Sequence, residues 1–339
     1  MIRGKREFVA AACAATGATW LLERLPRQPV LMILNYHRIG DADATQYDSG
    51  MFSCTAAEFD WQLTYLKRHF RMTTLDEVLG LLAGDGRLSE PRVLVTFDDG
   101  YIDNYQQAFP LLVRHGVQGV FFLPTAFTGT SRIPWWDAIA YIIKRSRKTR
   151  FRIEYPESEE FDLAAEGAAR TIMRVLTHYK QPAMRDHDRF VEELERVCES
   201  SRPDCVAERC FLDWNEAREM QRGGMGFGSH THNHEILSKL SSGKQFEELS
   251  LSRQILQREL KQDIDTLAYP VGARHTFSSE TVEALRRAKY RAAFSFNSGF
   301  NKAGSIEPYD IRRCGVDRPQ RRRFRFQTAV GSLTGRVWF

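Results

Sequence analysis

The sequence is poor in cysteine and has no closely spaced cysteine pair. Six cysteines in 339 residues, with no Cys-x-x-Cys pattern, do not imply a disulfide framework. Three of them fall between residues 198 and 210, but no matching histidine pair accompanies them, so we expect free thiols rather than a zinc site. The six are Cys13, Cys54, Cys198, Cys205, Cys210 and Cys314.

Long hydrophobic runs are also missing. The apolar stretch FVAAACAATGATWLL, residues 8–22, is shorter than the roughly 20 residues of a transmembrane helix and has no clean signal-peptide cleavage site. A lipid-attachment cysteine at Cys13 would need a longer apolar stretch before it. We therefore expect residues 1–30 to form an N-terminal helix or a weak membrane-anchor-like segment. These features favour a cytoplasmic or membrane-associated protein over a secreted one.

The chain has no large excess of charge of one sign. Lys and Arg number 48 and Asp and Glu 43, which favours a polyanion or an anionic lipid surface only weakly. We expect no nucleic-acid partner, and a peripheral membrane contact only through the N-terminus or the basic C-terminus. Residues 317–339 are expected to form a basic, solvated tail. Its arginine run is Arg321, Arg322, Arg323 and Arg325.

The chain does contain a regular alternation of short apolar runs and helical patterns, which is typical of a parallel sheet or barrel. Helix starts are marked by Thr55, Thr74 and Asp213, each with a glutamate three residues later, and helix ends by Gly116 and Gly223. Six or more βα units favour a barrel over an open sheet, although the periodicity alone does not show that the sheet closes. The apolar runs cover residues 30–36, 93–97, 117–123, 225–229, 266–270 and 291–296.

One segment interrupts this alternation, from about residue 130 to residue 211. It is too long for a loop, and the charged helical patterns AARTIMRVLTHY and DRFVEELERVC predict a helical insertion. Trp135 and Trp136 stand at its start. They either offer a sugar-stacking face or pack the insertion on the barrel, and packing is the favoured interpretation.

Two carboxylates stand where one apolar run ends. VLVTF, residues 93–97, is followed directly by Asp98, Asp99 and a glycine. Adjacent like charges are costly unless a cation lies beside them, and the carboxyl ends of barrel strands line the active face. A plain Asp-Asp-Gly turn is also common after strands. On this stretch alone the two interpretations are about equal.

A second polar cluster favours the cation. GFGSHTHNHEIL places three histidines within five residues, directly after another apolar run. His230 and His234 are four residues apart and can converge on one ion, whereas His232 is expected to point away. A carboxylate plus two histidines is a common ligand set for a catalytic divalent metal. Two such clusters at strand ends favour a metal site over a surface loop.

These motifs carry a family resemblance. TFDDG, HTHNH and LAYPVG resemble the motifs of the polysaccharide deacetylase family, also called the NodB-homology domain. The opening LNYHRIG resembles the branch that includes poly-N-acetylglucosamine deacetylases, in which the catalytic motifs are rearranged in chain order. The resemblance covers residues 31–316. It implies an α/β fold, a distorted (β/α)7 barrel of the NodB-homology type, with the helical insertion at about 130–211.

The resemblance also implies roles for individual residues. Asp99, His230 and His234 would hold the metal, usually zinc, with cobalt, nickel or manganese as alternatives. Asp98 would be the general base that takes a proton from water. A backbone N–H near Tyr269 would share the oxyanion.

The sequence departs from the family pattern in two places. In place of Arg-x-Pro-Tyr it has only AYP at residues 268–270, so the arginine that orients the base must come from elsewhere, and Arg313 is our candidate. No histidine follows His275, so the usual late Leu-x-His element is absent. His37 ends the first apolar run, and the branch with rearranged motifs carries its catalytic acid in such an element. We therefore predict His37 as the acid, with His275 as the alternative.

Together these features predict a metal-dependent hydrolase that removes N-acetyl groups from a polysaccharide or a lipid-linked amino sugar. The alternatives are a hydrolase of the same family acting on O-acetyl or N-formyl groups, and a carbohydrate-binding barrel without turnover. Asp98 separates binding from catalysis, because a binding protein does not need a general base. Its presence favours an enzyme.

Overall fold

The computed structural model describes residues 2–84, 88–203 and 209–335, and the chain divides into two compact units. We call them the barrel unit and the insertion unit, and each is described by itself. The barrel unit consists of residues 1–40, 53–129 and 211–339, and the insertion unit of residues 41–52 and 130–210.

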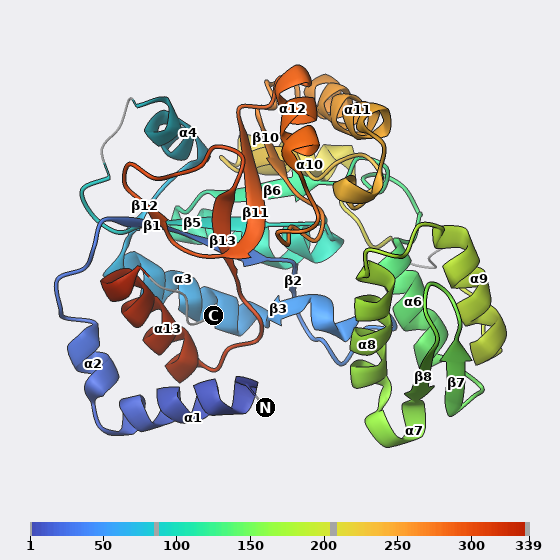
Figure 1. The fold of residues 1–339 in the computed structure, drawn as a ribbon. Helices are drawn as coiled ribbons and strands as arrows, with labels where there is room; N and C mark the ends of the chain where they lie inside the picture. The colour runs from blue at the N-terminus through green and yellow to red at the C-terminus, as the bar shows by residue number, and fades with distance from the viewer. Residues whose placement is uncertain (1, 85–87, 204–208, 336–339) are drawn as a thin grey trace. The chain divides into compact units, whose positions relative to one another are not determined.

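A closed barrel of parallel strands forms the centre of the barrel unit (Figure 1). The first strand pairs with the second strand of the ring on one side and with the last on the other, which closes the sheet. The predicted seven-stranded barrel is therefore confirmed. In order around the ring, its strands are β1 (Val30–Tyr36), β5 (Arg92–Phe97), β6 (Gly119–Leu123), β9 (Gly226–Ser229), β10 (Thr266–Ala268), β11 (Ala292–Ser298) and β13 (Ile311–Gly315).

Shorter strands lie outside this ring. β4 (Arg71–Met72) pairs with β5, and β12 (Asn301–Lys302) runs antiparallel to the start of β1. A separate two-stranded sheet consists of β2 (Arg38–Ile39) and β3 (Phe52–Cys54).

Alternate residues of the barrel strands enter two different cores. Leu31 and Ile33 of β1 join residues from five other barrel strands in the barrel interior, whereas Met32 and Leu34 belong to a cluster that includes residues of the surrounding helices. Because both faces are covered, β1 and β5 are buried along their whole length. This explains why these strands read as continuous apolar runs.

Helices connect the barrel strands, and the three predicted helix starts are confirmed. Thr55 caps α3, and complete capping boxes at Thr74 and Asp213 start α4 and α10. The predicted ends at Gly116 and Gly223 are the C-caps of α5 and α10. The helices are α3 (Ala56–His69), α4 (Leu75–Ala83), α5 (Phe109–His115), α10 (Trp214–Arg222), α11 (Ser242–Leu260) and α12 (Ser279–Arg287), with short turns η2 (Asn104–Ala108) and η3 (Leu237–Lys239).

The insertion unit has its own hydrophobic core and is not purely helical. Besides the expected helices it contains a β-hairpin, and residues 41–52 belong to it, which the sequence pattern did not indicate. Trp135 and Trp136 are buried in this core of the insertion unit itself. Its elements are η1 (Ser49–Met51), α6 (Trp135–Lys144), β7 (Arg150–Ile153), β8 (Glu159–Asp162), α7 (Leu163–Glu166), α8 (Ala168–Lys180) and α9 (His187–Cys198).

We expected the C-terminal arginine run to form a solvated tail, and this expectation was wrong. The run belongs to helix α13 (Arg321–Thr334). Phe324 of this helix is buried and packs edge-to-face on Trp61 of α3 at 6.1 Å. Arg323 and Arg325 form ion pairs with acidic residues of the N-terminal segment. The helix is therefore held both by apolar packing and by ion pairs.

The N-terminal segment forms two helices, α1 (Ile2–Ala15) and α2 (Ala18–Leu22), and α1 runs beside α13 (Figure 1). Among the described residues, no helix is long and apolar enough to cross a membrane. The described cysteines form no disulfide, and Cys205 lies outside the described residues.

Candidate active site

The two adjacent aspartates at the end of β5 contact different groups because the chain turns between them. The backbone N–H of Asp98 still donates to Tyr36 O at 3.0 Å, as in a strand. Asp99 then adopts a left-handed conformation with φ of 71°, and Gly100 follows with φ of 67°. A Cβ at Gly100 would lie 2.6 Å from Leu123 Cδ2, so only glycine fits this turn.

Both carboxylate oxygens of Asp98 are hydrogen-bonded. Arg313 Nη1 donates to Oδ1 at 2.7 Å, and Arg313 Nη2 donates to Oδ2 at 2.8 Å. Asn35 Nδ2 also donates to Oδ2, at 3.1 Å. Two parallel hydrogen bonds make this ion pair stronger than a single bond would, and they fix the orientation of the carboxylate relative to the guanidinium. The structure thus places Arg313, our candidate for the missing arginine, directly on the predicted base.

The guanidinium of Arg313 is itself held in place from several strands. Its side chain is fully buried, Nε donates to Ser295 O at 3.0 Å, and Nη1 donates to Asn35 Oδ1 at 2.7 Å. Thr96 Oγ1 donates to the same amide oxygen of Asn35 at 2.8 Å. The sequence analysis missed Asn35. A single amide in the otherwise apolar strand VLMILNY was the available signal.

The burial of these groups follows from their position along the strands. Inward-facing positions of β1 are apolar at Leu31 and Ile33 and become polar at Asn35. The same change occurs on β13, where Ile311 is followed two residues later by Arg313. The barrel interior is therefore apolar at the amino ends of the strands and polar at the carboxyl ends, where barrel active sites lie.

The electrostatic surroundings keep Asp98 ionised. Burial is the largest single influence and raises the pKa of this carboxyl, but the charge and hydrogen bonds of Arg313, together with His230 and His37, outweigh it and hold the pKa below its ordinary value. A buried ion pair of this kind is stable only when further hydrogen bonds support it, and here Asn35 bonds both partners while Ser295 O accepts from Arg313 Nε.

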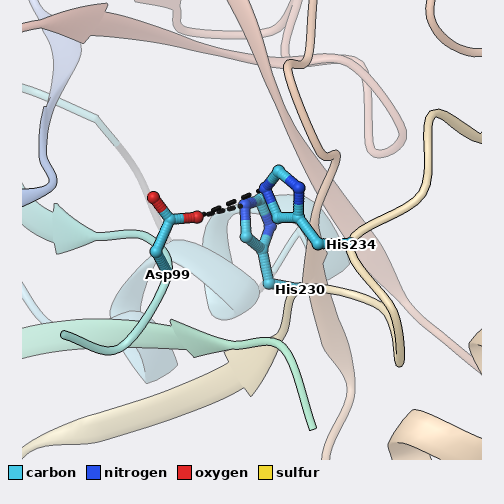
Figure 2. Close-up of side chains that lie close together, drawn as sticks. All are labelled: Asp99, His230 and His234. Carbon is cyan, nitrogen blue, oxygen red and sulfur yellow. Dashed lines mark ion pairs between the residues drawn. The ribbon is translucent and has the colours of Figure 1, made fainter. Parts of the chain in front are cut away.

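Asp99, His230 and His234 converge on one point (Figure 2). Asp99 Oδ1 lies 3.5 Å from His230 Nε2 and 3.2 Å from His234 Nε2. One ligand atom from each residue lies within 4.8 Å of the others, and all three side chains are buried. The structure thus brings together the three predicted metal ligands from two different strand ends.

The loop that carries the histidines has an uncommon backbone. Thr231 and His234 both have positive φ, at 65° and 58°, which is rare for residues with a Cβ and is often found at functional sites. Thr231 Oγ1 accepts a hydrogen bond from the N–H of His234 at 3.1 Å, and the N–H of His230 donates to Leu123 O at 3.0 Å. These bonds fix the loop in the conformation that turns both imidazoles toward Asp99.

The donor set fits a divalent cation. Ala268 O can only accept a hydrogen bond, so His230 Nδ1 at 2.8 Å must donate to it, which directs Nε2 toward Asp99. Within the described part of the chain, the buried Oδ1 of Asp99 receives no hydrogen bond of normal geometry. Burial lowers the pKa of His234, which favours the neutral imidazole that metals bind. A buried carboxylate oxygen facing two ring nitrogens is an arrangement that a cation satisfies.

His232, the middle histidine, lies away from this cluster as expected. Its Nδ1 is 2.8 Å from Thr125 Oγ1. The N–H groups of His232 and Asn233 both donate to Glu248 of α11, at 3.0 and 2.8 Å. Glu248 therefore anchors the histidine loop, a role that the sequence pattern did not indicate because the two segments are distant in the chain.

His37, the predicted acid, stands directly after β1 and is half-buried. Its backbone is held by Ser53 Oγ, which accepts from the His37 N–H at 3.0 Å, and by Asn104 Nδ2, which donates to His37 O at 2.7 Å. The imidazole lies near enough to contribute to the lowered pKa of both Asp98 and Asp99. His275, the alternative, is exposed in the loop after β10.

Tyr269 itself does not supply the N–H that the resemblance places near this residue. Its backbone N–H donates to Phe294 O at 3.0 Å and so continues the pairing of β10 with β11. That N–H is therefore not available to an oxyanion. The side chain is also engaged, because its hydroxyl donates to Tyr309 O at 3.0 Å.

The closed parallel ring with its polar site at the carboxyl ends defines a (β/α)7 barrel of the NodB type. A family model described as polysaccharide deacetylase matches residues 85–155 and 160–293. The chain belongs to the polysaccharide deacetylase family. YxkH of Bacillus subtilis, a protein named for the same family, is 32% identical over 107 residues, which cover 31% of this chain and 35% of YxkH.

Solved structures of low sequence identity share the fold. The deacetylase PplD of Streptococcus pyogenes has a TM-score of 0.56 at 19% identity, and the alignment covers 88% of this chain and 98% of PplD. IcaB from Ammonifex degensii has the same score and identity, with 90% and 98% covered. A de-N-acetylase from Aggregatibacter actinomycetemcomitans has a TM-score of 0.52 at 16% identity, with 85% and 95% covered. At these identities the likeness establishes the fold alone.

Proposed function

We propose that this protein is a metal-dependent hydrolase that removes N-acetyl groups from an amino-sugar polymer or a lipid-linked amino sugar. The observation that carries the proposal is the pair of aspartates. Asp98 is held by Arg313, while its neighbour Asp99 faces two imidazoles. One carboxylate positioned for proton transfer beside another positioned as a ligand is what metal-assisted amide hydrolysis requires.

Asp99, His230 and His234 are the proposed ligands of the metal, with zinc as the first expectation for one carboxylate and two imidazoles. Cobalt, nickel or manganese are alternatives. When bound, such an ion supplies Lewis acidity toward water and toward the acyl carbonyl. The bond from His230 Nδ1 to Ala268 O orients one ligand ring for this purpose.

Asp98 is the proposed general base. It accepts one proton from the attacking water as the oxygen of that water forms a bond to the acetyl carbon. Arg313 and Asn35 fix the plane of the carboxylate. Oδ1 accepts one hydrogen bond and keeps a lone pair for the proton, whereas Oδ2 accepts two. Arg313 therefore acts through Asp98 as a positioning residue.

His37 is the proposed general acid. The bond between the acetyl carbon and nitrogen breaks as His37 gives a proton to that nitrogen, which leaves as the free amine, while the water oxygen remains in acetate. Histidine is the side chain that most often donates protons in catalysis near neutral pH. The backbone contacts of His37 to Ser53 and Asn104 fix its position at the end of β1.

Two observations support an N-acetylated carbohydrate as the substrate. The chain belongs to the polysaccharide deacetylase family, and one solved structure of the same fold is a de-N-acetylase. The test is to incubate the purified protein with N-acetylglucosamine oligomers and their O-acetylated and N-formylated counterparts, and to measure acetate against formate. Acetate release from the N-acetyl oligomers supports the proposal. Release of acetate or formate only from the O-acetyl or N-formyl compounds would instead identify a hydrolase of those groups. The variant Asp98→Asn is the control for contaminating activity.

A further inference from the structure

Exposed apolar side chains are concentrated at the N-terminus. Seven large hydrophobic residues are exposed in the described part of the chain, and four of them lie within residues 8–25. Single exposed apolar residues are common on protein surfaces, but a concentration of them marks an interaction site. The four are Phe8 at 75% exposure, Trp20 at 51%, Leu21 at 58% and Leu25 at 50%.

The same region carries the net positive charge of the protein. We call residues 2–30 and 320–335, which include α1, α2 and α13, the terminal layer. It contains nine Lys or Arg and two Glu, a formal charge of +7. Because the whole chain carries +5, all other residues together carry −2. The small net charge of the sequence therefore conceals a strongly basic layer on a slightly acidic protein.

Both glutamates of the terminal layer form ion pairs with arginines of the same layer. Glu7 pairs with Arg323 at 2.9 Å, and Glu23 pairs with Arg325 at 2.8 Å. These pairs bind α13 to the N-terminal segment. The remaining arginines include Arg24 and Arg322, which are exposed. Arg321 pairs with Glu58 of α3 at 3.3 Å, but with nine cationic and two acidic residues the layer keeps an excess of positive charge beside exposed apolar groups.

One pair in the layer shows how the two properties combine. The guanidinium of Arg24 lies 3.4 Å from the centre of the Trp20 ring, and Arg24 Nη1 donates to Trp20 O at 3.2 Å. Both side chains are exposed. Tryptophan and arginine with apolar neighbours are characteristic of the boundary between lipid headgroups and acyl chains.

We propose that the terminal layer is a surface that binds bilayers containing anionic lipids. Trp20, Leu21 and Leu25 enter the headgroup region while the arginines meet lipid phosphates, without any helix crossing the bilayer. Charge complementarity selects this occupant. A second copy of the chain would present the same +7 layer and would be repelled. None of the proposed catalytic residues belongs to the layer, so this binding is independent of the proposed function.

The test is co-sedimentation of the full chain with vesicles. We expect binding to vesicles of phosphatidylcholine with added phosphatidylglycerol, little binding to phosphatidylcholine alone, and weaker binding as salt is raised. Trp20→Ser combined with Leu25→Ser, and separately Arg24→Gln combined with Arg322→Gln, should each lower the partition coefficient by about tenfold. Circular dichroism and deacetylation of a soluble oligomer should be unchanged in both variants.

Met173→Ser provides the matched control, because Met173 is 61% exposed and lies on α8 of the insertion unit. It should bind vesicles like the wild type. Equal binding to both vesicle types, or unchanged binding in both double variants, would overturn the proposal. A change of oligomeric state in the variants, measured by analytical ultracentrifugation without any change in vesicle binding, would assign the surface to a second copy instead.

Discussion

Asp98 and Asp99 are neighbours in the chain and are equally buried, at 3% and 2% exposure, yet their surroundings differ in kind. Every oxygen of Asp98 receives a hydrogen bond from the protein, and a cation of the protein compensates its charge. Asp99 Oδ1 instead faces two imidazole nitrogens, and among the described residues no donor of normal geometry reaches it. The folded protein itself supplies the polar partners of Asp98, whereas the position of Asp99 Oδ1 suits a bound ligand.

This difference separates two kinds of effect that a substitution can have. The partners of Asp98 belong to the folded protein, so removing them should cost stability as well as rate. Asp99 and its histidines gain their last partner only by binding, so removing one of them should cost affinity for that ligand. The five predictions that follow use this contrast, and their expected effects decrease in size.

The largest effect should follow from removing a proposed ligand. His234→Ala takes one imidazole from the cluster, so bound metal, near stoichiometric in the wild type, should fall to background, and activity should be lost with it. Mass spectrometry of the purified protein measures the metal. His232→Ala is the control, because His232 contacts Thr125 outside the cluster. Unchanged metal content in His234→Ala would remove the site from the proposal.

Asp98→Asn tests the other half of the comparison. The amide keeps the shape of the side chain but cannot accept the proton, so turnover should fall on the order of 10² or more while metal content is retained. Asp99→Asn should show the reverse order and lose metal affinity first. If both variants keep metal and activity, the aspartates form only a turn.

His37→Ala should fold and bind metal normally and lose about 10²-fold in turnover on an amide. The loss on an ester should be smaller, because an alkoxide leaves with less help from an acid than an amine does. His275→Ala, an exposed histidine, is the control. An equal loss on both substrates would indicate a positioning role, and no loss on either would exclude His37 from the mechanism.

Arg313→Ala leaves Asp98 buried without its cation. We expect a loss of about 3–5 kcal/mol in the free energy of unfolding and a fall in rate of roughly tenfold, with metal retained. Urea unfolding and steady-state kinetics measure the two. Arg312→Ala, one residue earlier and exposed, should change neither. Wild-type values for both quantities in Arg313→Ala would show that Asp98 needs no orienting cation.

The smallest effect is expected at Asn35. Asn35→Ala removes the amide between Asp98 and Arg313 but leaves their direct ion pair, so the free energy of unfolding should fall by about 1–3 kcal/mol, with a modest loss of rate. Asn301→Ala is the matched control. Asn301 is a buried amide on β12 that donates to Arg312 O at 2.9 Å. Equal stability losses with a rate loss only in Asn35→Ala would place Asn35 in the site, whereas equal rates would make it structural.

The sequence predicted the parts of this site that are local in the chain. TFDDG and HTHNH each follow an apolar run, and parallel strands bring such ends together. The contact between Asn35 and Arg313 could not be predicted in this way, because it joins residues 278 positions apart. The strand that carries Arg313 was not among the apolar runs, since its sequence IRRCG is broken by the charge that the site uses.

The hairpin of the insertion unit was missed for a different reason. In β7 the residues Arg150, Phe151, Arg152 and Ile153 alternate between exposed and buried, which is the period of a half-buried strand. The signal is only four residues long, and the helical patterns that follow it dominated the interpretation. In α13 the apolar face was overlooked because four arginines share the helix with it.

Closure of the barrel by β1 and β13 has a consequence for the order of folding. During synthesis β1 can pair with β5 early, but its other edge waits until residues 311–315 have left the ribosome. Arg313 arrives with that last strand, and until then Asp98 has no buried cation beside it. The carboxylate must stay hydrated or protonated in every earlier intermediate. Docking of the final strand and assembly of the proposed catalytic base are therefore one event in folding.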